Sequence, residues 1–303
     1  MFIDIHTHSA FARHPAVSRP NGSTYPTPER LIEMMDEHGI DKAVVLSTLS
    51  PEFRYTIVIP EEVLKIQQHF PDRIIPFCNL DPRFIGNSPD SDFRPLLQAY
   101  KELGCKGVGE YIPNIPFDDP LNINVFRQVE EIGLPLTFHI APRAGGCYGC
   151  IDDVGLPRLE KVLQACPDLK LLAHSQAFWA EISTDVIRGG ERVGYPTGPV
   201  TPGRVVELMR RYPNLLGDLS AHSGFNAISR DPEFGYAFLE EFQDRLFWGT
   251  DIANDPQELP IVGYFRNLKA EKLISEDAYE KITWRNADRL LGLGLEPEGE
   301  EHP

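Results

Sequence analysis

The stretch LPLTFHI, residues 134–140, is a short and nearly continuous apolar run with a histidine close to its end. Such a run is typical of a parallel strand that is covered on both faces. Seven further apolar runs are spread along the chain, at Phe2–His8, Lys42–Thr48, Arg73–Leu80, Cys105–Tyr111, Lys170–Ser175, Leu215–Ala221 and Leu246–Ile252. The sequence therefore predicts eight strands.

Helical patterns separate these strands. In Pro28–His38 the residues Leu31, Met34 and Met35 recur with the period of a helix, and Gly39 follows as a typical helix end. The other predicted helices are Pro60–Phe70, Phe93–Leu103, Asn122–Ile132, Leu156–Ala165, Thr201–Tyr212, Asp231–Phe242 and Ser275–Leu291. Eight strand–helix units predict an α/β protein with a closed (β/α)8 TIM barrel. We expect one domain over residues 1–295 and an acidic C-terminal tail over residues 296–303.

An open doubly wound sheet is the alternative. It is disfavoured because no Gly-rich phosphate-binding motif follows the first strand. Two connections, Ala141–Gly155 and Gln176–Val200, are unusually long. In a barrel both would lie at the carboxyl ends of the strands, where active sites are built.

The composition excludes several classes of partner. The 303 residues include 29 Lys and Arg against 45 Asp and Glu, a formal net charge of -16, and they contain no basic run that would bind nucleic acid. No apolar stretch approaches the roughly 18 residues that span a bilayer, and no signal-peptide pattern opens the chain. Five cysteines do not make a disulfide framework in a chain of this length. We expect a cytoplasmic protein with no nucleic-acid or membrane partner.

Residues that can bind a metal gather at the predicted strand ends. His6 and His8 are two apart on one strand, so their side chains point to the same face. Four more strand ends carry a carboxylate or an imidazole, at Glu110, His139, His174 and Asp251. A barrel brings these ends together around one axis, and imidazole with carboxylate suits Zn, Mn, Fe or Co. The alternative, that these are scattered structural histidines, requires several coincidences at once.

With these residues in place, the sequence resembles the amidohydrolase superfamily of metal-dependent barrels. The resemblance is strongest to its amidohydrolase-2 branch, which includes decarboxylases of carboxylated aromatic acids. It covers nearly the whole chain and depends on the motifs IDIHTH, KGVGEY, LTFHI, LLAHS, FWGTD and NADRLL. The resemblance implies that His6, His8 and Asp251 bind a first metal. In mononuclear members His139 joins them and His174 is catalytic, whereas in binuclear members His139 and His174 bind a second metal.

The chain departs from the commonest binuclear pattern at the fourth strand. Many relatives have a lysine there that becomes carbamylated and bridges the two metals, but this chain has Glu110. A carboxylate can occupy the same bridging place. One or two ions therefore remain open, with two slightly favoured, and zinc is the expected metal ahead of Mn, Fe or Co.

Further side chains near the strand ends are candidates for catalysis and substrate binding. Asp251 can be both a ligand and the base that passes a proton to the leaving group, although it can also cap a helix. His174 can stabilise developing negative charge. Arg143 can bind a substrate carboxylate, and Trp179 can wall an aromatic substrate, with core packing as the alternative. His222 is a candidate substrate contact.

Two other features have no assigned role at this stage. Asp218 points inward lower in the seventh strand. Cys147 and Cys150 form a CxxC motif in a glycine-rich loop, but no second pair completes a zinc site, so we expect two loop thiols that can pair locally.

Three functions are compatible with this pattern. The first is a metal-dependent hydrolase in which a metal-activated water attacks a C–O or C–N bond of a lactone, ester or amide in a small, carboxylated substrate. The second is a non-oxidative, metal-dependent decarboxylase of a carboxylated aromatic or related acid. Two ions would favour hydrolysis and one would favour decarboxylation. The third, a non-catalytic ligand-binding barrel, would need a missing ligand. Dimers are common among relatives of this kind, so a homodimer is an open alternative to a monomer.

Overall fold

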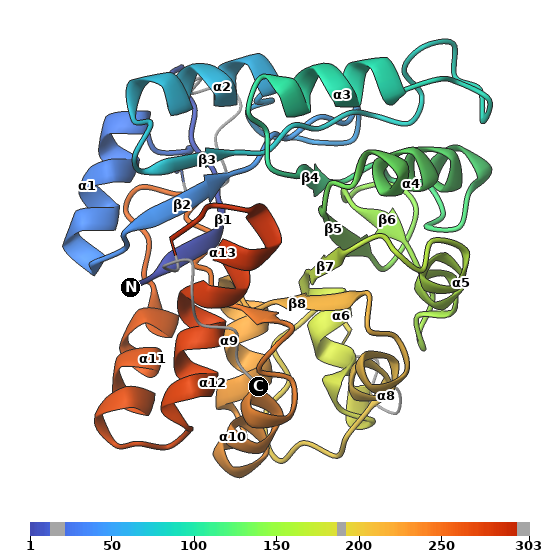
Figure 1. The fold of residues 1–303 in the computed structure, drawn as a ribbon. Coiled ribbons are helices and arrows are strands. Elements are labelled where there is room, and N and C mark those ends of the chain that lie inside the picture. Colours follow the sequence, from blue (N-terminus) through green and yellow to red (C-terminus); the bar gives the residue numbers. More distant parts are fainter. Residues whose placement is uncertain (13–21, 187–191, 296–303) are drawn as a thin grey trace.

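The computed structural model describes residues 1–12, 22–186 and 192–295. Its strands lie at the centre with helices around them (Figure 1). The strands are β1 (Ile3–Thr7), β2 (Lys42–Val45), β3 (Ile74–Pro76), β4 (Val108–Tyr111), β5 (Leu136–Ala141), β6 (Cys150–Ile151), β7 (Leu171–His174), β8 (Leu215–Asp218) and β9 (Leu246–Phe247). All strands except β6 follow the eight predicted runs, and β6 is a two-residue strand in the long connection after β5.

The strands close into a parallel barrel. They form two parallel sets in the orders β1-β2-β3 and β4-β5-β7-β8-β9. Backbone hydrogen bonds join the sets at both seams, where the amide of Gly109 donates to Cys78 over 2.8 Å and the amide of Ile5 donates to Trp248 over 3.1 Å. The predicted single-domain (β/α)8 barrel is therefore confirmed. The predicted tail, residues 296–303, lies outside the described residues.

Apart from α11, which the sequence did not predict, the outer helices match the predicted order. They are α1 (Pro28–His38), α2 (Pro60–His69), α3 (Arg94–Glu102), α4 (Pro120–Ile132), α5 (Pro157–Ala165), α8 (Arg204–Arg211), α10 (Pro232–Glu241), α11 (Pro260–Ala270), α12 (Glu276–Glu280) and α13 (Asn286–Leu291). Helix α1 begins with Thr27, whose hydroxyl accepts from the amide of Arg30 over 3.3 Å, and ends at Gly39 in a left-handed conformation. The last predicted helix, Ser275–Leu291, is divided by a π-helical turn between α12 and α13.

Two helices that the sequence did not predict begin at the carboxyl ends of strands. Helix α6 (Gln176–Trp179) follows β7, and α9 (Ala221–Ser229) follows β8. The predicted strand Leu215–Ala221 therefore ends early, because its last residues begin α9. Both helices lie on the side of the barrel where the candidate ligands emerge.

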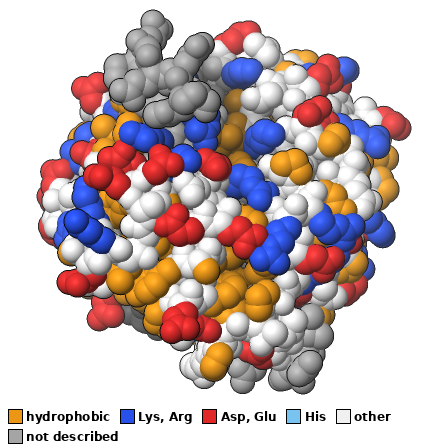
Figure 2. Space-filling view, turned by 60° about the horizontal axis from the view of Figure 1, so that its bottom comes forward, with side chains coloured by type: hydrophobic (Ala, Val, Ile, Leu, Met, Phe, Trp, Pro, Cys, Tyr) orange, Lys and Arg blue, Asp and Glu red, His pale blue; other side chains and the backbone are white. Residues whose placement is uncertain are grey.

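The core has two parts. A large cluster of buried apolar side chains lies between the strands and the surrounding helices, and a smaller one includes Ile5, Val44 and Leu172 together with Ala287 and Leu291 of α13. On the face shown in Figure 2, acidic and basic side chains are intermixed. Within the described residues, the helices are too short or too polar to cross a bilayer.

Candidate metal centre

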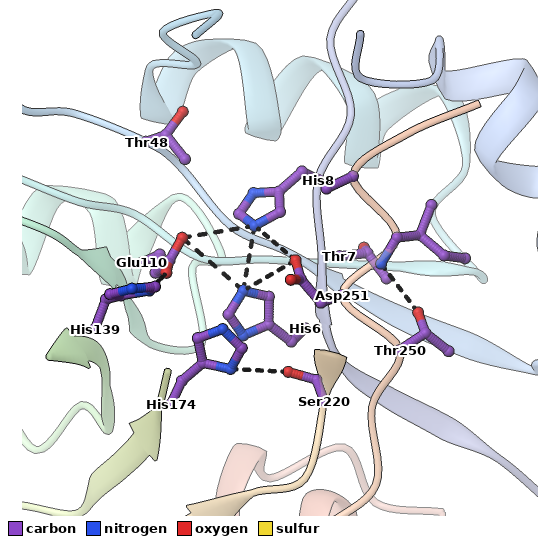
Figure 3. Close-up of polar contacts among 12 residues, drawn as sticks. His6, Thr7, His8, Thr48, Glu110, His139, His174, Ser220, Thr250 and Asp251 are labelled. Carbon is purple, nitrogen blue, oxygen red and sulfur yellow. Dashed lines mark hydrogen bonds and ion pairs between the residues drawn. The ribbon is translucent and has the colours of Figure 1, made fainter. Parts of the chain in front are cut away.

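Four side chains direct one donor atom each toward a common point (Figure 3). The donors are Nε2 of His6, Nε2 of His8, Oε2 of Glu110 and Oδ1 of Asp251. The two nitrogens are 3.2 Å apart, and Asp251 lies 3.7 Å from the first and 3.4 Å from the second. Glu110 lies 4.0 and 3.6 Å from the same nitrogens. Tetrahedral N and O ligands about 2.0–2.2 Å from a zinc ion are about 3.3–3.6 Å apart, so the donor set and its spacing fit such an ion.

A second possible metal-binding group lies next to the first. Donor atoms of Glu110, His139 and His174 all lie within 4.8 Å of one another. Glu110 belongs to both groups, because its Oε1 is 2.8 Å from Nδ1 of His139 while its Oε2 faces His6 and His8. The structure thus brings all six predicted ligands into one cluster, with Glu110 between the two halves.

Local backbone irregularities position two of these ligands. His6 and Glu110 both lie at β-bulges. Residues 4–7 of β1 and residues 108–111 of β4 each advance three residues along their strand while the paired strand advances two. A bulge turns the next side chain to the other face of the sheet. Gly109 permits the second bulge, because its φ is 146° and a Cβ there would lie 2.8 Å from a carbonyl oxygen of β5.

Asp4 ties the first ligand strand to the loop that carries Asp251. Its Oδ1 accepts from the amide of Thr250 over 2.9 Å and from the amide of His6 over 3.1 Å, and its Oδ2 accepts from the Thr250 hydroxyl. Burial raises the pKa of Asp4 to about 7. Asp251 itself has a positive φ of 55°, and the Gln257 amide holds its carbonyl over 2.7 Å. These contacts hold a strained backbone in place at the site.

The carboxylates of the cluster are held in their ionised form despite their burial. Burial raises the pKa of Glu110, but the hydrogen bond from His139 and the nearby histidines outweigh this effect and lower it. Burial also raises the pKa of Asp218 and that of Asp251, but nearby histidines outweigh it and lower both: His6 and His174 act on Asp218, and His8 and His6 act on Asp251. Buried ionised carboxylates require a compensating cation. A bound divalent ion would meet that requirement.

A cavity of about 490 Å³ opens above the cluster. Side chains of the metal cluster, His8, Glu110, His139, His174 and Asp251, line its floor. Loop residues line its mouth, among them Arg54, Arg143, Cys147 and the tyrosines Tyr25, Tyr55, Tyr148 and Tyr195. Both arginines are exposed. Arg143, a predicted substrate contact, therefore lies at the mouth of the cavity.

The structure does not place two other predicted substrate contacts in the cavity wall. Trp179 is 1% exposed and packs in the core, where its indole N–H donates to the carbonyl of Asp218 over 2.8 Å. The prediction that Trp179 walls the substrate must be corrected accordingly, because α6 turns this side chain inward. His222 is exposed, and its ring lies 5.8 Å from that of Tyr195, so it reaches the cavity only through that residue.

Sequence reasoning missed the second arginine at the mouth and the four tyrosines. Arg54 and Tyr55 lie in the connection after β2, where no helical or strand pattern shows which way a side chain points. Cys147 is half-buried at the cavity, while Cys150 is buried in β6. Both thiols are free, so the local disulfide is not formed here.

Comparison with known proteins agrees with this fold. The family profile described as amidohydrolase, Amidohydro_2, matches residues 3–293. Among curated proteins, none matches the chain in sequence. An uncharacterised TIM-barrel protein from Bordetella bronchiseptica is similar in structure, with a TM-score of 0.65 and 19% identity over 96% of this chain and 98% of that one.

Two further similar structures have named activities. One is a probable 2-pyrone-4,6-dicarboxylic acid hydrolase from Acinetobacter baumannii with citric acid bound, with a TM-score of 0.58 and 17% identity over 96% of this chain and 99% of that one. The other is a 5-carboxyvanillate decarboxylase from Novosphingobium aromaticivorans, complexed with manganese and a nitrobenzoic acid, with a TM-score of 0.59 and 16% identity over 96% of each chain. At this identity they support the fold alone.

A parallel barrel with possible metal-binding residues at its strand ends is typical of metal-dependent TIM-barrel enzymes. The chain belongs to the amidohydrolase family Amidohydro_2, which matches it over nearly its whole length.

Proposed function

We propose that the chain is a metal-dependent hydrolase that cleaves a C–O or C–N bond of a small, carboxylated substrate. The observation that supports this function is the cluster of His6, His8 and Asp251 joined through Glu110 to His139 and His174, on the floor of a cavity. The shared carboxylate is what a pair of adjacent ion sites requires.

The first ion would be held by His6, His8, Asp251 and Oε2 of Glu110. The second would be held by Oε1 of Glu110 with His139 and His174. Zinc is the expected metal, with Mn, Fe or Co as alternatives. A divalent ion in such a site lowers the pKa of a water from 15.7 to about 7 and polarises a carbonyl oxygen.

The protein side chains then handle protons and charge. The Asp251 side chain is 25% exposed at the cavity floor, so it can accept a proton there and return it to the leaving group. His174 contacts Ser220 and Asp218 through Nδ1, so Nε2 is left for the substrate, and in the doubly protonated form of the ring it would donate to negative charge that develops there. If both ions are bound, that nitrogen is a ligand instead.

The mouth of the cavity favours an anionic substrate. The side chains of Arg54 and Arg143 line it, and neither forms an ion pair with another described residue, in a chain with a net charge of -16. Guanidinium groups bind carboxylates through paired hydrogen bonds. A substrate with a carboxylate at the end opposite its scissile bond would place the carboxylate at the arginines and the scissile bond at the metals.

Decarboxylation is the second candidate, and one contact favours it. Nδ1 of His139 is 2.8 Å from Glu110, a normal hydrogen bond. If this bond persists in the working enzyme, Oε1 of Glu110 is not available to a second ion, and one ion is bound. That arrangement would suit a carboxylated aromatic acid that loses carbon dioxide.

Product analysis in ¹⁸O-labelled water separates these two functions. The Zn- or Mn-loaded protein is assayed with a panel of lactones, esters, amides and aromatic carboxylates. We expect products that contain one ¹⁸O atom and no release of carbon dioxide. Release of one carbon dioxide per turnover without ¹⁸O would contradict hydrolysis and support decarboxylation.

A further inference from the structure

Asp218, the last residue of β8, is buried beneath both metal groups. Its Oδ2 lies 2.6 Å from Nδ1 of His6 and 3.4 Å from Nδ1 of His174. Its Oδ1 accepts from the amide of Ser220 over 3.0 Å. One carboxylate therefore faces a histidine from each group.

The surrounding core holds this carboxylate in place. The indole of Trp179 donates to the backbone carbonyl of Asp218. Gly217 leaves room for that indole, because a Cβ there would lie 3.0 Å from the Trp179 ring and 2.7 Å from Leu246. The aromatic side chain that does not reach the substrate thus supports the residue beneath the ligands.

The contacts at the Nδ1 atoms decide which nitrogen faces the metal site. A carboxylate next to Nδ1 favours the form of the ring in which Nδ1 carries the hydrogen, so Nε2 is left for a metal or a substrate. Nε2 of His6 is the atom that faces His8 and Asp251. His174 has a second contact, with Ser220 Oγ at 3.0 Å, that His6 does not share.

We propose that Asp218 is a positioning residue shared by the two metal groups, which orients His6 and His174 together. This inference rests on the proposed metal sites, and it adds a coupling between them. Loss of the Asp218 carboxylate is expected to disturb the orientation of both His6 and His174, whereas loss of the Ser220 hydroxyl is expected to disturb the orientation of His174 alone.

The test compares Asp218→Asn with Ser220→Ala. Asp90→Asn, a substitution of an exposed residue, is the control. Affinity for Zn²⁺ and Mn²⁺ is measured by competition with a chelator. Asp218→Asn is expected to weaken binding of the first ion about 10- to 100-fold, the usual effect of losing such a partner. Ser220→Ala and Asp90→Asn are expected to bind the first ion within about twofold of the unmodified protein. Equal affinity in Asp218→Asn would overturn the proposal.

A spectroscopic measurement keeps the test independent of folding and activity. In protein with ¹⁵N-labelled histidine, the Nδ1–H of His6 is expected as a slowly exchanging, downfield proton signal, identified by its loss in His6→Gln. Its absence from the unmodified protein contradicts the proposal even if Asp218→Asn does not fold. If the protein binds no divalent ion, the proposed function fails, while this signal still tests whether Asp218 orients His6.

Discussion

The floor and the mouth of the cavity are built in different ways. On the floor, Glu110 and His174 come from barrel strands, are buried, and have several polar contacts each. At the mouth, Arg54 and Arg143 come from connections between strands and helices and are exposed. Under the proposed function, the barrel would hold the reactive groups rigidly, while the loops would select the substrate.

The largest expected effect is on the floor. Asp251→Asn keeps the size of the side chain but removes its ability to accept a proton. We expect turnover to fall about 10²- to 10⁴-fold, the usual contribution of a general base, with the fold and part of the metal retained. Steady-state kinetics and circular dichroism measure the two properties. Unchanged kcat would remove Asp251 from proton transfer.

A smaller effect is expected at the mouth. Arg54→Ala and Arg143→Ala each remove a charge that can bind a substrate carboxylate. We expect KM to rise about tenfold in each variant with little change in kcat, because the contact forms in the ground state as well. Arg127→Ala, an exposed arginine on α4, is the control and should leave KM unchanged. A large loss of kcat with unchanged KM would contradict a role in substrate binding.

The smallest effect concerns the ion pair that holds the connection carrying Arg54 in place. Glu52, two residues before Arg54, pairs with both terminal nitrogens of Arg83 at 2.6 and 2.9 Å. This contact with Arg83 lowers the pKa of Glu52 to about 2. Its stabilising contribution is complete above the unfolded pKa near 4.5 and is lost as pH falls toward 2.

The free energy of unfolding should therefore decrease more steeply over that pH range in the unmodified protein than in Glu52→Gln. After allowance for solvent screening, the difference is about 1 kcal/mol. Urea unfolding at several pH values measures this difference. Glu258→Gln, a substitution of an exposed residue, is the control. Parallel pH profiles for Glu52→Gln and the unmodified protein would show that Glu52 does not anchor the loop.

This contrast also explains which parts of the molecule were predictable. Strand ends follow from runs of apolar residues, and the barrel brings strand ends together, so His139 and His174 were predictable as neighbours although 35 positions separate them. The bulges at His6 and Glu110 were not, because they depend on pairing with the adjacent strand.

The loop residues show where sequence reasoning fails. A side chain just after a strand can turn into the cavity or into the core, and Trp179 turns into the core because α6 begins there. Arg54 lies in a connection without a periodic pattern, so its place at the mouth depends on contacts such as that of Glu52 with Arg83. Asp218 had no predicted role because its partners come from two other strands.

Metal analysis tests the central claim most directly. Elemental analysis of the purified protein, with anomalous scattering from its crystals, gives the number and position of bound ions. We expect at least one divalent ion per chain between His6, His8, Glu110 and Asp251, and its loss in the double variant His6→Ala and His8→Ala. Full metal content in that double variant, or an ion bound away from these four residues, would contradict the account.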